Sequence, residues 1–309
     1  MLCYKAVIGV VAITAMVLLT ACVTDEKAGP PTIDTGADRF LYKDPATATG
    51  RSLWVWTYRP KSFTADSPIV FVMHGVKRNA DIYRNNWITL ADYHGFLIVT
   101  PEFSRDDFPG SWHYNLGNVM YRADSNGALA ANAERYWSFP IIDRVFDIVR
   151  DLTKTNRTSF SLFGHSAGGQ FVHRYMTFTG GPRVDLAIAA NPGWYTMTTR
   201  KEKFPYGLGG TKVTDDDLRR LYARPLVVLL GEDDTQRGTY LRTTPEADRQ
   251  GANRLERGKT YFAGAKRNAL ARKMPFNWKL QTVPGVGHKN AGMAGPAADL
   301  IKRGASAAP

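Results

Sequence analysis

Cysteine is nearly absent from this chain of 309 residues. There are two, Cys3 and Cys22, and both lie within the first 22 positions. The rest of the chain has no thiol, which excludes disulfides and cysteine-ligated metals there. We therefore expect the hydrophobic core alone to stabilise the fold.

Several other signatures are missing or weak. The sequence has no metal-ligand cluster, dinucleotide fingerprint or phosphate-binding loop, so we expect no metal and no cofactor. Acidic residues number 28 against 40 basic ones, which gives a net charge of +12. The basic residues are spread along the chain, and nothing resembles a nucleic-acid-binding module. We interpret them as a solvated surface, with modest attraction to anionic lipid or substrate as the alternative.

Long apolar runs are also scarce, and the clearest one covers residues 6–19, directly after Lys5. It is shorter than the ~20 residues that span a bilayer as a helix. It ends in small residues, which predicts a signal peptide over 1–21. The ending Leu-Thr-Ala-Cys resembles the lipobox of bacterial lipoproteins, which implies cleavage before Cys22 and attachment of lipid to its sulfur. Val23 after it implies the outer membrane of a Gram-negative envelope. An ordinary secreted protein is the alternative.

The remaining chain is expected to form one domain. Residues 22–38 are polar and contain Gly-Pro-Pro, which predicts an extended tether, and 304–309 are predicted to be a disordered tail. Residues 39–303 contain no second linker and no repeat. Apolar strand patterns alternate with helical patterns, which predicts an α/β fold with a mostly parallel central sheet and helices on both faces. Apart from a strand within residues 158–169, the expected strands are 52–58, 69–73, 96–100, 186–190, 226–230 and 278–283. The expected helices include 81–94 and 141–153.

The stretch T-S-F-S-L-F-G-H-S-A-G-G, residues 158–169, is the most informative part of the sequence. An apolar run meets Gly-His-Ser-Ala-Gly, and a helical pattern follows at once. In a G-x-S-x-G elbow the small residues allow a strained turn that exposes the serine at a helix N-terminus. Ser166 is therefore a candidate nucleophile. A glycine-rich connection with an idle serine is the alternative, so the motif needs partners.

A serine nucleophile requires a base and a group that orients the base. His288 lies in the flexible loop Pro-Gly-Val-Gly-His after an expected strand and is the candidate base, while the other histidines are interpreted mainly as structural. Residues 226–230 run into Gly-Glu-Asp-Asp-Thr, where one of three carboxylates could accept from an imidazole N–H. Serine, acid and histidine then follow the chain order of α/β-hydrolases.

An oxyanion needs hydrogen-bond donors as well. The backbone N–H of Ala167, just after the serine, is one expected donor. The second is the N–H of Val76, because the strand 69–73 runs into His74-Gly75-Val76 and Gly75 allows the backbone to bend toward the serine.

With these motifs the sequence resembles α/β-hydrolases of the polyhydroxybutyrate-depolymerase and feruloyl-esterase type. The resemblance covers most of the domain, from H-G-V through F-G-H-S-A-G-G-Q-F and L-G-E-D-D-T to V-P-G-V-G-H. It implies that Ser166 is the nucleophile, Asp234 in the G-x-x-D-T pattern the acid and His288 the base. Many secreted members have disulfides and a longer substrate-binding region, which this chain lacks, and this argues against a polymeric substrate.

Aromatic residues gather near the expected strand ends. Trp112 and Trp194, together with His74, are candidates for substrate binding, with covering of the core as the alternative. The expected function is a serine hydrolase that cleaves small or oligomeric carboxylic esters. A peptidase of the same fold and a non-catalytic, lipid-anchored binding protein are the alternatives. The sequence does not indicate an oligomeric state.

Overall fold

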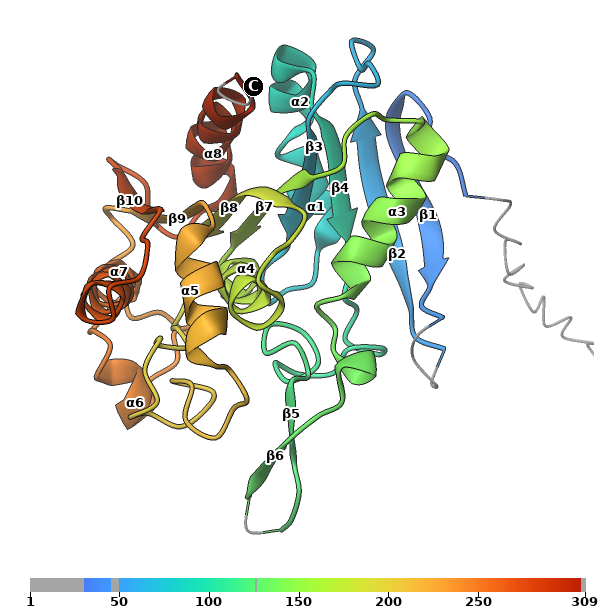
Figure 1. Ribbon diagram of the computed structural model, residues 1–309. Coiled ribbons are helices and arrows are strands. Elements are labelled where there is room, and N and C mark those ends of the chain that lie inside the picture. The colour runs from blue at the N-terminus through green and yellow to red at the C-terminus, as the bar shows by residue number, and fades with distance from the viewer. Residues whose placement is uncertain (1–30, 46–49, 126, 307–309) are drawn as a thin grey trace, which may run out of the picture.

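The computed structural model describes residues 31–45, 50–125 and 127–306 (Figure 1). The predicted signal peptide, Cys22 and most of the predicted tether lie outside the described residues, as do residues 307–309. The lipid anchor therefore stays a prediction.

An eight-stranded sheet forms the centre of the molecule, in the order β1-β2-β4-β3-β7-β8-β9-β10. The first pairs, β1 with β2 and β2 with β4, are antiparallel, and the remaining pairs are parallel. The predicted α/β class with a mostly parallel sheet is thus confirmed. The strands are β1 (Gly36–Lys43), β2 (Ser52–Arg59), β3 (Ile69–Met73), β4 (Leu97–Pro101), β7 (Phe160–His165), β8 (Val184–Ala190), β9 (Leu226–Gly231) and β10 (Trp278–Val283).

Helices cover both faces of this sheet because alternate side chains of its buried strands point to opposite sides. Within β3, Phe71 lies in the apolar core of one face, whereas Val70 and Val72 lie in that of the other. The first face is covered by α3 (Ile141–Thr153), α4 (Ala167–Thr179), α5 (Asp215–Ala223) and α7 (Arg254–Ala271), and the second by α1 (Ala80–Asn85), α2 (Ile88–His94) and α8 (Asn290–Ser306) (Figure 1).

The predicted elements match the observed ones with a few differences. The helix expected over 81–94 is interrupted between α1 and α2, where the fully buried Trp87 packs against Phe163 with ring centres 5.1 Å apart. Strand β1 begins at Gly36, so residues 36–38 belong to the sheet and not to a tether. Helix α8 continues to Ser306, so residues 304–306 are helical rather than a disordered tail.

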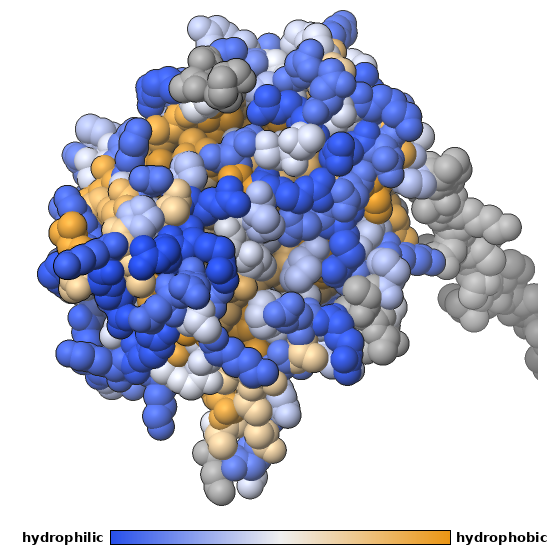
Figure 2. All heavy atoms as spheres, in the orientation of Figure 1, coloured by the Kyte–Doolittle hydropathy of each residue, from blue (hydrophilic) through white to orange (hydrophobic). Residues whose placement is uncertain are grey.

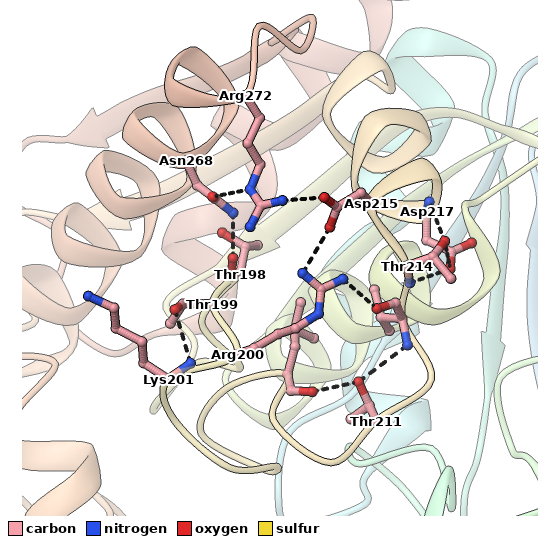
Figure 3. Close-up of polar contacts among 12 residues, drawn as sticks. Thr198, Thr199, Arg200, Lys201, Thr211, Thr214, Asp215, Asp217, Asn268 and Arg272 are labelled. Atoms are coloured by element: carbon pink, nitrogen blue, oxygen red, sulfur yellow. Dashed lines mark hydrogen bonds and ion pairs between the residues drawn. The ribbon is translucent and has the colours of Figure 1, made fainter.

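Two irregular connections complete the fold. Strands β5 (Met120–Arg122) and β6 (Leu129–Ala131) form a hairpin that projects from the body, close to the 3-10 helix Glu134–Tyr136 (Figure 1). Residues 191–214 link β8 to α5 and are fixed by polar contacts (Figure 3). At the start of α5, Asp215 accepts hydrogen bonds from Arg200, at 2.9 Å, and from Arg272, which directly follows α7. The short helix α6 (Pro245–Asp248) lies between β9 and α7.

Polar side chains dominate much of the surface over α5, α6 and α7 (Figure 2). Among the described residues, no helix combines the length and apolar character needed to cross a membrane. Within the same ranges, no group of three or more histidine, cysteine or carboxylate side chains is placed to hold a metal ion.

Candidate active site

Ser166 occupies a sharp turn between β7 and α4. Its backbone has φ 60° and ψ −117°, a conformation that non-glycine residues rarely adopt. The flanking glycines make the turn possible by close backbone packing. A Cβ on Gly164 would lie 2.3 Å from the carbonyl oxygen of Gly168, and one on Gly168 would lie 2.0 Å from that of Met73. The predicted elbow is therefore present, with the serine at the N-terminus of a 13-residue helix.

The structure brings together the three residues that the sequence singled out. His288 Nδ1 donates to Asp234 Oδ2 at 2.7 Å. That bond leaves Nε2 of the neutral ring as an acceptor, and it lies 3.0 Å from Ser166 Oγ. This is the geometry in which a histidine can remove the proton of a serine hydroxyl. The two neighbouring carboxylates, Glu232 and Asp233, are exposed, whereas Asp234 is buried.

Each of the three side chains comes from a loop at the carboxyl end of a parallel strand. Ser166 follows β7, Asp234 follows β9 and His288 follows β10. The fully buried Asn191 follows β8, and its side chain bonds to the segments that carry Asp234 and His288. Its Oδ1 accepts from the N–H of Gly231 at 2.8 Å, and its Nδ2 donates to the carbonyl of Gly287 at 3.4 Å. The sequence alone predicts no role for Asn191 in the site.

A buried arginine contacts the acid from the other side. Arg254 Nη1 donates to Asp234 Oδ1 at 3.3 Å, and both side chains are at most 5% exposed. Arg254 is the first residue of α7. The sequence alone also predicts no role for Arg254, although Asn253 and Glu256 around it form a recognisable helix-start pattern.

His165, in the variable position of the elbow, lies beneath His288 with ring centres 4.6 Å apart. Its Nδ1 is 3.2 Å from the hydroxyl of Tyr83, and burial lowers the pKa of His165 well below its usual value. The charges of His288 and Arg254 lower it further. His165 is thus a neutral packing residue beside the candidate base, in agreement with the structural role expected for it.

The loop after β3 lies beside the serine. A Cβ on Gly75 would be 3.8 Å from the Ser166 Cβ, an ordinary contact distance, and 2.6 Å from the Tyr83 hydroxyl, which would have to shift. Arg105 donates to the carbonyl of Val76 at 3.0 Å and helps to fix that peptide. Val76 therefore belongs to a loop next to Ser166, and Ala167 directly follows Ser166 at the start of α4.

The substrate-binding expectation for His74 has to be corrected. Its side chain is fully buried and both ring nitrogens are used by the backbone: Nδ1 donates to the Gly75 carbonyl at 3.1 Å, and Nε2 accepts from the Phe103 N–H at 3.0 Å. The Tyr114 ring stacks on it at 4.6 Å, and the Tyr114 hydroxyl donates to the His74 carbonyl at 2.6 Å. His74 therefore shapes the loop from inside and has no surface left for substrate.

The two tryptophans lie differently from one another. Trp194 is 4% exposed, with the guanidinium groups of Arg174 and Arg242 at 4.2 and 4.9 Å from its ring centre. That burial leaves little of it for substrate contact, and its main role is packing. Trp112 is partly buried near Phe204, with ring centres 6.1 Å apart, so its expected role in substrate binding stays a prediction.

Two cavities lie apart from these groups. One of about 420 Å³ is lined by residues from the amino ends of the strands, including Ser161, Asp185 and Leu226, and by α8. The other, of about 210 Å³, lies between the β5–β6 hairpin and residues 211–217. Ser166, Asp234 and His288 line neither cavity. The first cavity lies at the amino ends of the strands, whereas these three residues lie at the carboxyl ends.

Known structures resemble this chain closely. Poly(aspartic acid) hydrolase-1 from Sphingomonas sp. KT-1 is 39% identical, with a TM-score of 0.81, over 87% of this chain and 99% of its own. LpqC, a poly(3-hydroxybutyrate) depolymerase from Bordetella parapertussis, is 39% identical, with a TM-score of 0.82, over 88% and 90%.

More distant structures share the fold alone. An S-formylglutathione hydrolase from Agrobacterium tumefaciens is 16% identical, with a TM-score of 0.53, over 89% of this chain and 97% of its own. A scan against protein-family models and a search of curated proteins gave no match.

At 39% identity over most of both chains, the similarity goes beyond a shared architecture. The strand order, the serine elbow and these two relatives lead to one assignment. The chain belongs to the α/β-hydrolase family that includes the depolymerase LpqC and poly(aspartic acid) hydrolase-1.

Proposed function

We propose that this hydrolase cleaves carboxylic esters, with Ser166 as nucleophile, His288 as base and Asp234 as the acid that orients the base. The observation that carries the proposal is the continuous hydrogen-bonded series from Asp234 to His288 to Ser166, at 2.7 and 3.0 Å. Serine is a weak nucleophile unless a base accepts its proton, and this series supplies one.

The reaction has two steps. Ser166 Oγ attacks the ester carbonyl carbon while His288 Nε2 takes the hydroxyl proton. The tetrahedral anion is stabilised by the N–H groups of Val76 and Ala167, and its collapse breaks the bond to the alcohol, which takes the proton from His288. Water then attacks the acyl-serine while His288 accepts its proton. His288 passes this proton to Ser166 Oγ as the acid leaves, which regenerates the Ser166 hydroxyl.

Substitution of the nucleophile tests the assignment. The Ser166→Ala variant should fold like the parent and lose about four or more orders of magnitude in kcat/KM on p-nitrophenyl esters. Ester hydrolysis at the parental rate by the variant would exclude Ser166 as nucleophile.

Amide hydrolysis is a second candidate, favoured by the 39% identity to a poly(aspartic acid) hydrolase. Likewise, the identity to LpqC supports oligomeric hydroxyalkanoate esters as substrates. Kinetics with a matched ester and amide of one acyl group separate the two. We expect the ester to react faster, and a larger kcat/KM for the amide would identify an amidase.

We further propose that the chain is exported and anchored through lipid on Cys22. The support is the apolar segment and the Leu-Thr-Ala-Cys sequence. Cells expressing the full chain and fed a clickable fatty acid should label the protein, and Cys22→Ser should abolish the label. Equal labelling of both proteins would exclude this anchor.

A further inference from the structure

The buried arginine beside the acid has no role in the reaction described so far. The two oxygens of the Asp234 carboxylate have different partners, His288 on Oδ2 and Arg254 on Oδ1. Arg254 is 4% exposed and its Nε, also buried, has no hydrogen-bond partner among the described residues. A buried guanidinium with an incomplete set of partners is costly. A well-satisfied salt bridge therefore does not explain why an arginine occupies this position.

Helix stability does not explain the presence of Arg254 either. Arg254 is the first residue of α7, where the unpaired N–H groups create partial positive charge. A cation is unfavourable at this end of a helix, whereas Glu256, two residues later, is favourable. The position of Arg254 is explained by the carboxylate that it contacts.

The helix start is also held rigidly, which fixes the point from which Arg254 reaches Asp234. The Asn253 side chain accepts from the Glu256 N–H at 3.0 Å and donates to the Glu256 carboxylate at 2.8 Å. The same carboxylate accepts from the Ala252 N–H at 2.8 Å. Arg254 thus approaches the acid from a capped helix end, independently of the loop that carries His288.

We propose that Arg254 is a positioning residue of the hydrolase, which fixes the Asp234 carboxylate toward His288 and sets the pH at which the Asp234–His288 pair takes up a proton. The proposal rests on the function given above. A cation next to this pair opposes the arrival of a second positive charge on it.

Within the described ranges, few other charges lie near the pair that could have this effect. His165 and Tyr195 are buried and uncharged, with a lowered and a raised pKa respectively, chiefly because of burial. Lys289 and Asp233 are exposed, where solvent screens their charges. The groups facing the pair are therefore Ser166 and His165 from the elbow, Tyr195 after β8, Asp233 beside the acid, Lys289 after the base and Arg254 from α7.

Two substitutions separate the charge of Arg254 from its hydrogen bond. Arg254→Gln keeps a donor but removes the charge, whereas Arg254→Lys keeps the charge. Arg257→Gln is the matched control, because Arg257 is a fully buried arginine in the same helical turn that bonds to Asp248 and the Gly193 carbonyl. For each protein, kcat/KM on p-nitrophenyl butyrate is measured from pH 5 to 9, and folding is checked by thermal unfolding.

The midpoint of the acid limb should move up by about 0.5–1 pH unit in Arg254→Gln and stay near the parental value in Arg254→Lys. Arg257→Gln should lose stability without moving the midpoint. The proposal is overturned if Arg254→Gln is folded and keeps the parental midpoint, or if Arg257→Gln shifts it equally.

A measurement without turnover separates this proposal from the proposed function. The His288 imidazole signal, assigned by its loss in His288→Gln, is titrated by NMR in the parent and in Arg254→Gln. A shifted titration in a protein that does not hydrolyse esters would support the role of Arg254 while refuting the esterase. An active enzyme with superimposable titrations would refute the role of Arg254 alone.

Discussion

The imidazole of His165 lies directly against that of His288, with ring centres 4.6 Å apart and planes tilted by 36°. Its Nδ1 lies 3.2 Å from the Tyr83 hydroxyl, and its Nε2 is buried without a hydrogen-bond partner in the part of the chain that the structure describes. A second charged imidazole at this distance would oppose protonation of the base. Burial avoids the conflict because it holds His165 in the neutral form.

An uncharged ring should therefore replace His165 with little effect on chemistry. We expect His165→Phe to keep kcat/KM within about tenfold and to lose roughly 1 kcal/mol of unfolding free energy with the Tyr83 contact. Ester kinetics and urea unfolding check this. A loss of several orders of magnitude in a folded His165→Phe protein would show that the ring takes part in proton transfer.

Buried neutral histidines should make the fold sensitive to acid. Burial lowers the pKa of His74 to about 3 and that of His173 well below its usual value. In both rings Nε2 accepts a backbone N–H, from Phe103 and Thr196 respectively, so a proton there would break the bond. Below about pH 6.5 both histidines bind a proton in the unfolded chain but not in the folded chain. The stabilisation that the two neutral histidines contribute to the fold is therefore complete above about pH 6.5 and falls as the pH drops toward about 3.

Each of these histidines should lower the unfolding free energy by about 1.4 kcal/mol per pH unit below about pH 6. Urea unfolding between pH 5 and 7.5 measures the slope in the parent and in His173→Gln. The slope of the variant should be smaller by about the contribution of one histidine, because the carboxylates contribute equally to the slope in both proteins. Identical slopes would contradict a neutral, buried His173.

Gly168, in the elbow after Ser166, should not tolerate any side chain. In Gly168→Ala the new Cβ would meet the Met73 carbonyl oxygen at 2.0 Å, and we expect a loss of about 3 kcal/mol, the upper end for overpacking, together with loss of activity. Gly304→Ala is the control, because its Cβ would approach nothing closer than 4.0 Å and alanine favours the helix. Thermal unfolding of both variants checks this, and an unchanged melting temperature for Gly168→Ala would refute the close packing.

The sequence revealed those features that depend on local pattern. Apolar runs marked the central strands, and the glycines around Ser166 marked the elbow, because strand burial and a tight turn each restrict residue type nearby. No local pattern predicts the helix break at Trp87, whose ring packs against Phe163, distant in the chain.

The supporting residues of the site depend on contacts far apart in the sequence. Asn191 bonds to backbone groups 40 and 96 positions away, and Arg254 reaches an acid 20 positions earlier. No periodicity or spacing encodes such contacts. The burial of His74 also depends on a distant contact, because the ring of Tyr114, 40 positions later, covers it.

Covalent labelling of the serine tests the central claim most directly. The purified domain, without residues 1–22, is treated with a fluorophosphonate and its peptides are mapped by mass spectrometry. We predict an adduct on the Ser166 peptide of the parent that is lost in His288→Ala, because the histidine activates the serine. A folded parent that acquires no adduct, or one whose adduct lies on another serine, would contradict the account.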